Sequence, residues 1–349
     1  MQTPFRAEFF SHSLELVAWA QVENAPAAFD YLTLDATTVT TNKALDAVSP
    51  LDLCRVVSAD GTRFSGVVSA STVTDAGTSV TVKPLLALLD VTCVFDRTRL
   101  QTATLEQFLA EILTDLYAGG DALQNLAGFN AVTTSETPGA KLNLKDNVHS
   151  LYDILTSALK KYGVVVSMDF DPAAKTVTAT IGKAEDRRWI IEADLPGCAD
   201  VSVDFSDGLD GTNKLTLVDK NDEAQRVTYY LHPDGSVDTS GENRIAPVRF
   251  AFEYIDDEDF ASAAAERADD ALKPAEYDNL IELTVLHTNR VVRWREHAVG
   301  EPVMVLYRGA RYKSVFTGWK ESERTATLTF GAVRLELTKK LILERRRNA

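Results

Sequence analysis

Two stretches of this chain follow the same pattern, and no other feature constrains its fold as strongly. The first runs from Gly61 to Val82 and the second from Gly309 to Phe330. At a constant offset of 248 residues the matched positions are Gly61 with Gly309, Arg63 with Arg311, Phe64 with Tyr312, Val67 with Val315, Val80 with Leu328, Thr81 with Thr329 and Val82 with Phe330. Each copy reads as a turn glycine, a strand, a polar turn and a return strand. The pattern predicts a duplicated hairpin module, although two unrelated amphipathic hairpins can also look alike.

The first copy lies in a run of closely spaced strands. The alternation predicts strands over residues 51–57, 63–71 and 78–83, with turns at Asp60-Gly61 and at Asp75 to Gly77. Such a meander must close into a barrel or be covered, because open strand edges pair with other chains.

The pattern becomes helical at about residue 97. Thr104 and Gln107 form a capping-box signature, and apolar residues follow at helical spacing as far as Leu116. A second apolar stripe runs from Val148 to Tyr162 and stops at Gly163. With the hairpin expected over residues 164–181, this region is a small α+β unit.

Strands return from Trp189 onward, and one of them begins at Asn213. A helix is predicted over residues 256–272, because acidic residues begin it and Pro274 follows it. The predicted fold class is α+β and mainly β, with two related antiparallel β-barrel domains flanking a small α+β domain and a helix inserted in the second barrel. The predicted domains are 1–96, 97–186 and 187–349.

The composition limits the class of partner. The net charge is −15, which argues against broad binding of nucleic-acid phosphates. The chain has no run of 18 apolar residues, and its N-terminus lacks a signal-peptide pattern, so we expect a protein made in the cytoplasm without a membrane span.

The sequence offers no convincing catalytic, cofactor or metal site. Its five histidines show no metal-ligand spacing and are His12, His149, His232, His287 and His297. Its three cysteines are far apart, and Cys54 and Cys93 lie in apolar runs that predict buried thiols. No nucleophile elbow and no phosphate-binding glycine loop is present. We therefore assign no catalytic, cofactor-binding or metal-binding residue and expect no cofactor.

Three features leave alternatives open. The acidic stretch from Asp204 to Asn213 is consistent with turn chemistry or with an opportunistic cation, since its order is not that of an EF-hand. The basic cluster Arg345 to Arg347 is either a solvated end or a contact for a charge-matched partner. The 51 acidic residues offer many possible carboxylate pairs for glycoside hydrolysis.

The order of these modules resembles the tail hub proteins of bacteriophages, found at contractile baseplates and at the tips of long non-contractile tails. The motifs that carry the resemblance are D-G-x-R-F-x-G from Asp60, V-x-V-x-x-L-L-x-L-L-D from Val80, L-Y-D-I-L-T-x-A-L-K-K-Y-G from Leu151, N-K-L-T-L-V from Asn213, V-G-E-P-V from Val299, G-x-R-Y from Gly309 and T-L-T-F-G from Thr327. The resemblance implies that the strand at Asn213 opens the second barrel.

The resemblance implies a structural role in the virion tail, assembled in the host cytoplasm. Three subunits would form a homotrimer ring of six barrels with pseudo-sixfold symmetry, through which DNA passes transiently. The implied partners are a distal tail or tail-tube ring protein, a tail fibre or spike protein and the tape-measure protein. Many such hubs carry a catalytic C-terminal extension; the sequence ends at Ala349, so we expect no enzyme activity of that kind.

Two other functions remain as alternatives. One is a tail enzyme that degrades the cell envelope with a carboxylate pair. The other is a carbohydrate-binding module that uses exposed tryptophans such as Trp294 or Trp319.

Overall fold

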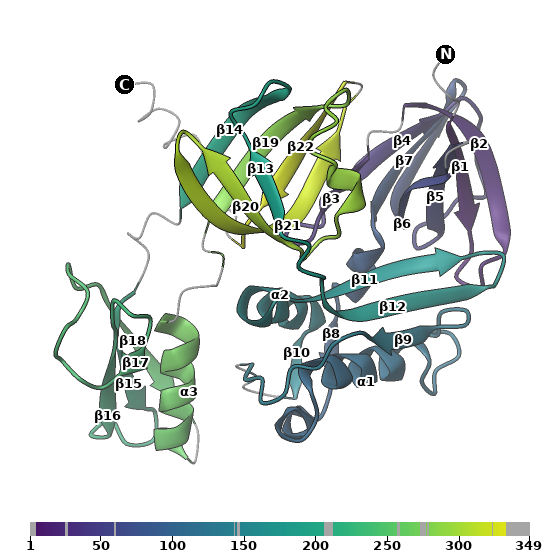
Figure 1. Ribbon diagram of the computed structural model, residues 1–349. Helices are drawn as coiled ribbons and strands as arrows, with labels where there is room; N and C mark the ends of the chain where they lie inside the picture. The colour runs from purple at the N-terminus through teal and green to yellow at the C-terminus, as the bar shows by residue number, and fades with distance from the viewer. Residues whose placement is uncertain are drawn as a thin grey trace. The chain divides into compact units, whose positions relative to one another are not determined.

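The computed structural model describes residues 5–24, 27–58, 61–142, 144, 147–205, 212–256, 259–272, 277, 279–322 and 324–332. The fold is α+β and mainly β (Figure 1). It divides into two compact units, the first made of Met1–Ala140, Asp146–Ser202 and Ile281–Phe330, the second of Lys141–Lys145, Val203–Leu280 and Gly331–Ala349. Among the described residues, no helix is long and apolar enough to cross a membrane.

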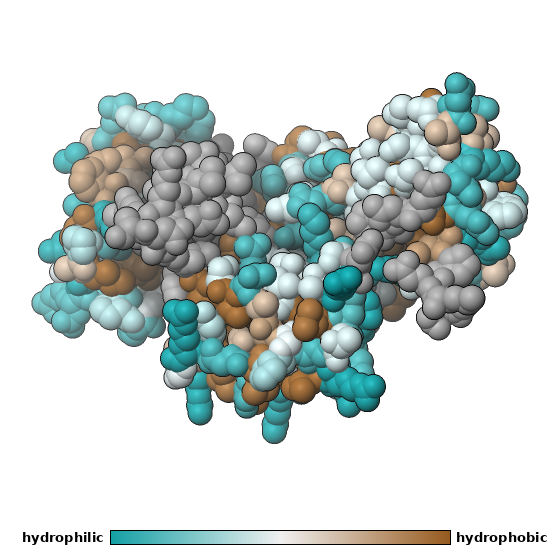
Figure 2. Space-filling model, turned by 90° about the horizontal axis from the view of Figure 1, so that it is seen from above, coloured by the Kyte–Doolittle hydropathy of each residue, from teal (hydrophilic) through white to brown (hydrophobic). Residues whose placement is uncertain are grey.

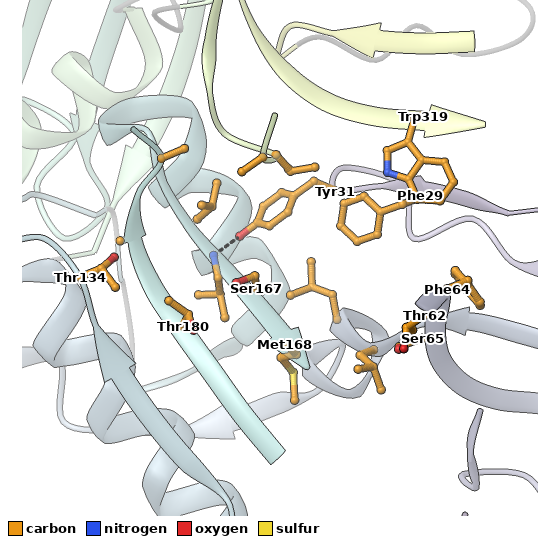
Figure 3. Close-up of a pocket in the computed structure, with 18 of the residues that line it drawn as sticks. Phe29, Tyr31, Thr62, Phe64, Ser65, Thr134, Ser167, Met168, Thr180 and Trp319 are labelled. Atoms are coloured by element: carbon orange, nitrogen blue, oxygen red, sulfur yellow. Dashed lines mark hydrogen bonds between the residues drawn. The ribbon is translucent and has the colours of Figure 1, made fainter. Parts of the chain in front are cut away.

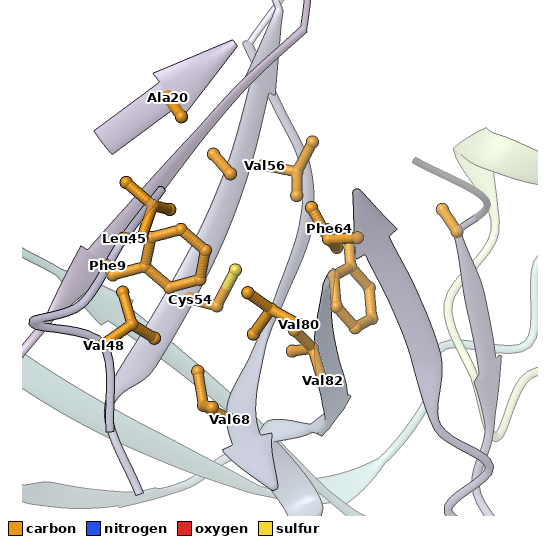
Figure 4. Close-up of a cluster of buried hydrophobic side chains, with 13 residues drawn as sticks. Phe9, Ala20, Leu45, Val48, Cys54, Val56, Phe64, Val68, Val80 and Val82 are labelled. Carbon is orange, nitrogen blue, oxygen red and sulfur yellow. The ribbon is translucent and has the colours of Figure 1, made fainter. Parts of the chain in front are cut away.

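The first unit begins with a closed six-stranded antiparallel barrel of order β1-β2-β4-β7-β6-β5. Its strands are β1 (Phe5–Phe10), β2 (Leu16–Asn24), β4 (Thr37–Thr41), β5 (Leu53–Ser58), β6 (Gly61–Thr74) and β7 (Gly77–Pro84). Inward-facing side chains such as Phe9, Cys54, Val80 and Val82 are fully buried and fill the barrel (Figure 4). The three strands expected from the alternation are confirmed, and closure leaves none of their edges open.

A mixed layer follows the barrel. Its elements are η1 (Leu85–Leu89), β8 (Thr92–Val94), η2 (Arg97–Gln101), α1 (Leu105–Tyr117), β9 (Asn130–Thr133), β10 (Val148–Ser150), α2 (Leu151–Tyr162), β11 (Val164–Asp171) and β12 (Thr176–Lys183). The predicted capping box is confirmed, because the Gln107 N–H donates to Thr104 Oγ1 over 3.3 Å and the Thr104 N–H donates to Gln107 Oε1 over 3.2 Å. Gly163 ends α2 with φ of 67°, a left-handed conformation that glycine adopts without strain. Strands β11, β12 and β9 form one sheet.

A second curled sheet completes the first unit, in the order β13-β20-β21-β22-β19-β14. Its strands are β13 (Trp189–Glu192), β14 (Cys198–Phe205), β19 (Asn279–Leu286), β20 (Pro302–Tyr307), β21 (Ala310–Glu321) and β22 (Thr325–Phe330), and η3 (Trp294–Glu296) lies between β19 and β20. The strand β3 (Ala28–Asp30), which comes from the first barrel's part of the chain, pairs with β21 (Figure 1). Unlike the expected antiparallel barrel, this sheet has a parallel pair, β13 with β20.

The two copies of the repeat have the same ladder register. In the first barrel Val68 pairs with Val82, the ladder skips one residue, and Ala70 pairs with Thr81. In the second sheet Phe316 pairs with Phe330, one residue is skipped, and Gly318 pairs with Thr329. Each of these residues of the second sheet lies 248 positions after its counterpart in the first barrel. The same offset holds for every following pair of the two ladders, which end at Val73–Thr78 and at Glu321–Ala326. A shared bulge position is a specific feature of strand pairing, so the repeat is structural and not an accident of amphipathic pattern.

The repeat is less exact at the turn that precedes it. Gly61 is already paired with Ser58 in the β5–β6 ladder, whereas Gly309 lies in the turn before Ala310. Arg63 consequently falls at a ladder irregularity and is partly buried, while Arg311 is exposed. Arg63 and Arg311, which the repeat matches, therefore differ in their strand pairing and in their exposure.

The second unit contains a four-stranded sheet of order β17-β16-β15-β18 and one helix. Its elements are β15 (Lys214–Asp219), β16 (Arg226–Leu231), β17 (Val237–Asp238), β18 (Phe250–Ile255) and α3 (Phe260–Leu272). Leu215 and Leu217 pack on Ala264 and Ala268 of the helix. The strand after Asn213 therefore does not open the second barrel as expected, because its ladder partners are β16 and β18 and its apolar face is covered by α3. The helix begins at Phe260 rather than at residue 256; residues 257–258 lie outside the described part.

Candidate functional site

Tyr31 joins the three layers of the first unit. It follows β3, and its N–H donates to the carbonyl oxygen of Thr317 in β21 over 2.9 Å. Its hydroxyl accepts the N–H of Val166 in β11 over 3.1 Å (Figure 3). Its carbonyl oxygen accepts the Tyr152 hydroxyl of α2 over 2.6 Å. Tyr31 is 1% exposed, and burial raises the pKa of its hydroxyl. One buried residue thus holds the first barrel's chain against both the mixed layer and the second sheet.

A cavity of about 510 Å³ lies beside this junction. Phe29, Phe64, Met168 and Trp319 contribute apolar walls from the three layers, and Figure 3 shows Phe29 next to Trp319. Its polar lining includes the hydroxyl groups of Thr134, Ser167 and Thr180. Among the described residues that line it there is no histidine, cysteine, aspartate or glutamate. The cavity is therefore suited to hold an apolar group.

A second cavity, of about 590 Å³, contains a charged cluster. Glu321 is 3% exposed and contacts two guanidinium groups: Arg63 Nη2 lies 2.7 Å from its Oε2, and Arg295 Nε donates to its Oε1 over 3.0 Å. The Arg63 contact is an ion pair and not an aligned hydrogen bond, because Arg63 Nε and Glu321 Oε2 have no hydrogen-bond partner among the described residues. Arg63 also lies 4.5 Å from the Phe5 ring centre. The buried carboxylate of Glu321 is thus paired with Arg63 of β6 and with Arg295 of η3. Pairing of a buried charge in this way is a structural role.

His297 also borders this cavity, and its contacts are structural. Its ring stacks on Trp189 with 3.8 Å between centroids, and its Nδ1 lies 2.8 Å from Oε1 of the buried Glu301. Trp294 and Trp319 approach to 5.3 Å, and Trp294 is 9% exposed. The alternative of a carbohydrate-binding module assumed that these tryptophans are exposed. This assumption is wrong for Trp294, which is buried and packs against the half-buried Trp319.

The other residues named from the sequence are dispersed. His232 is held by Asp238, with 3.0 Å between Nε2 and Oδ1, and the ring of His287 contacts the Ser322 carbonyl oxygen at 2.9 Å. Cys54 and Cys93 are buried free thiols, as predicted. No group of three potential metal ligands occurs among the described residues. Residues 206–211 of the acidic stretch and the basic cluster at 345–347 lie outside the described part.

The second unit exposes an aromatic strip. Phe250, Phe252 and Tyr254 alternate along β18, an end strand of its sheet, and are 66%, 66% and 61% exposed. Figure 2 shows one face of the molecule, on which hydrophobic residues lie among hydrophilic ones. Aromatic residues grouped on an exposed strand are typical of protein–protein contacts. Sequence reasoning missed this strip, although the F-x-F-x-Y alternation was a readable signal.

Comparisons with known proteins show which solved structures have a similar architecture. No protein-family model matches the sequence, and no curated protein matches it. Solved structures do match. A chain of the phage P2 baseplate in its activated conformation with calcium aligns at a TM-score of 0.58 and 12% identity, covering 95% of this chain and 100% of that one.

Two prophage proteins align over similar lengths. The 43 kDa tail protein of prophage MuSo2 from Shewanella oneidensis gives a TM-score of 0.54 at 15% identity, covering 95% of this chain and 98% of its own. The prophage tail protein gp18 from Listeria monocytogenes EGD-e gives 0.51 at 12% identity, covering 99% of both chains. The chain therefore has the fold of phage baseplate and prophage tail proteins, which confirms the resemblance to tail hubs at the level of the fold.

Proposed function

We propose that this protein is a structural hub of a phage tail tip or baseplate. Three copies form a pseudo-sixfold ring that joins the tail tube to the host-recognition or spike apparatus and lets DNA pass. The observation that carries the proposal is the repeat: two sheets in one chain share strand order and bulge register, so three copies supply six similar modules. The fold shared with baseplate and tail proteins supports the same role.

In this proposal the three domains, 1–96, 97–186 and 187–349, have different roles. The first and third domains form the ring, and the middle domain lies between them in the sequence. The partners are a tail-tube or distal tail ring protein on one side, a fibre or spike protein on the other, and the tape-measure protein. The net charge of −15 fits a lumen that DNA crosses without binding. The protein acts in the virion tail, after assembly in the host cytoplasm, and has no catalytic role.

The mass of the purified chain in solution tests the ring. Sedimentation or mass photometry is expected to give three times the 38.3 kDa chain mass, and negative-stain images are expected to show six similar lobes. A chain that stays monomeric at every concentration, and that joins no ring when mixed with neighbouring tail proteins, contradicts the proposal. Hydrolysis of peptidoglycan abolished by one Asp or Glu substitution would favour the enzyme alternative instead.

A further inference from the structure

The strand β18 forms an open edge of the sheet in the second unit. On its other side lies β15, and the Lys214 N–H of that strand donates to the Arg249 carbonyl oxygen over 3.0 Å. In a parallel pair, residues that bond to the neighbouring strand alternate with residues whose backbone groups point away from it. Because Arg249 bonds to β15, the backbone groups that face the open edge are those of Phe250, Phe252 and Tyr254. The sheet order puts no strand of the described ranges beside them.

This edge lacks the features by which proteins protect open strands, namely charged side chains, proline and short length. The opposite edge of the same sheet has them, because β17 is only two residues long and its Asp238 is held by His232. The strand β18 is six residues long, and its one charged residue is Glu253. That carboxylate accepts a hydrogen bond from Arg267 Nε of α3 over 2.6 Å, on the side of the helix. The edge of β18 is therefore free to accept another strand.

The aromatic side chains of β18 indicate what kind of partner fits. The rings of Phe250 and Phe252 lie 5.8 Å apart at 75° to each other, so they do not form the flat platform on which bases stack. The three aromatic side chains are each about two-thirds exposed and offer roughly 400 Å² of surface. One partner of a standard protein interface buries about 800 Å². The strip alone would thus give a weak contact, and a partner that adds main-chain hydrogen bonds to it fits best.

The strand is complementary to itself. In an antiparallel pair of two β18 strands centred on Phe252, that residue lies opposite its own copy, and Phe250 lies opposite Tyr254 of the second copy. All three aromatic side chains then meet an aromatic partner on the same face, an arrangement that stabilises paired strands. Each of these three pairs exchanges two main-chain hydrogen bonds, so the contact gains about six.

The charges fit the same register. No two like charges lie directly opposite each other, because Glu253 faces Ala251 of the second copy. Arg249 lies diagonal to Glu253 of the second copy, at a distance that long side chains can span. Its Nη1 is buried and has no hydrogen-bond partner among the described residues. A carboxylate from the second copy would thus meet a guanidinium group that has hydrogen-bonding capacity to spare.

We propose that β18 is a docking surface for β18 of a second copy of this chain, in the antiparallel register centred on Phe252. The contact is twofold, since the same surface is used on both sides. It goes beyond the proposed ring and does not depend on it, because a twofold contact joins copies in pairs and cannot close a ring of three. Where rings form, it links a subunit of one ring to a subunit of another.

Disulfide cross-linking of the full chain tests the register. In Phe252→Cys the two new cysteines would have their Cα atoms about 5.5 Å apart, within the range of a disulfide. The matched control is Phe250→Cys, an equally exposed position whose two copies lie four residues apart along the strands, about 14 Å. Under mild oxidation, Phe252→Cys is expected to give a covalent dimer on a non-reducing gel and Phe250→Cys is not. The double variant F250C/Y254C is expected to restore the dimer, and the wild-type chain sets the background from its own cysteines.

Sedimentation over a concentration series tests the contact without cysteines. Phe252→Lys puts two like charges opposite each other and is expected to raise the dissociation constant of the pair at least about tenfold. Leu123→Lys changes an exposed apolar residue of the first unit, 91% exposed, and is expected to leave the constant unchanged within about twofold. Equal urea midpoints for the variants and the wild type show that the fold is intact.

The outcomes separate this proposal from the ring. The edge contact is overturned if Phe252→Cys cross-links no better than Phe250→Cys, or if Phe252→Lys associates as the wild type does. A threefold mass without the Phe252→Cys cross-link overturns the edge contact and leaves the ring. A cross-linked pair without a threefold mass overturns the ring and leaves the edge contact.

Discussion

Removing the Tyr31 hydroxyl is the sharpest test of how the first unit is held together. In Tyr31→Phe the ring still fills its space, but the Val166 N–H, which lies 3.1 Å from the hydroxyl, loses its acceptor in a buried site. Leaving a buried donor unsatisfied costs about 1–3 kcal/mol. For a protein of this size, a loss of that magnitude lowers the midpoint of thermal unfolding by roughly 1–4 °C.

The assay is thermal and urea unfolding followed by circular dichroism, with Tyr254→Phe as the matched control. Tyr254 is 61% exposed, so removing the same atom there is expected to change the unfolding free energy by less than about 0.5 kcal/mol. Tyr31→Ala, which also removes the ring, is expected to cost about 3–5 kcal/mol, as large core truncations do. If Tyr31→Phe unfolds together with wild type and with the Tyr254 control, the hydroxyl does not join the layers and the reasoning fails.

Three further substitutions test charged groups. Glu106 is fully buried at the start of α1. Burial alone would raise the pKa of its carboxyl group, but hydrogen bonds from Ser135 and Thr137 outweigh this effect and lower the pKa. The contribution of Glu106 to stability is therefore present at pH 7 and is lost as the pH falls below about 4.3. Glu106→Gln is therefore expected to lower the urea midpoint at pH 7 and to have little effect at pH 3. Glu321→Gln leaves two arginines without their carboxylate and is expected to cost about 2–5 kcal/mol in the same assay, unless the cluster is dispensable, in which case the midpoint stays at the wild-type value. The hydrogen bond to Asp238 raises the pKa of His232. The pair therefore stabilises the fold fully below about pH 6.5, and this stabilisation disappears as the pH rises through the raised pKa. An NMR titration is expected to show a lower His232 pKa in Asp238→Asn, and an unchanged pKa would contradict the pairing.

Much of the candidate site was visible in the sequence as separate residues. Arg63 was singled out by the repeat, and Trp294, Trp319 and His297 by their type. Their meeting around Glu321 was not visible, because Arg63 and Glu321 are more than 250 residues apart in the chain and their contact depends on how two sheets pack. The row formed by Ile190, Met304 and Lys313 was hidden for the same reason, since these residues are aligned only through the register of β13, β20 and β21.

The sequence alone determined what depends on near neighbours. Residues a few positions apart define the capping box at Thr104, the apolar stripe of α2 and the alternation of β5 to β7. The repeat is recognised from the order of residue types along the chain. Tertiary structure alone decided the long-range pairings: β3 on β21, Tyr31 between the layers, and the strand after Asn213 in a separate sheet with α3. The physical reason is that a periodic pattern fixes which face of a strand is buried, whereas its partner is chosen by packing and hydrogen bonding among segments far apart in the chain.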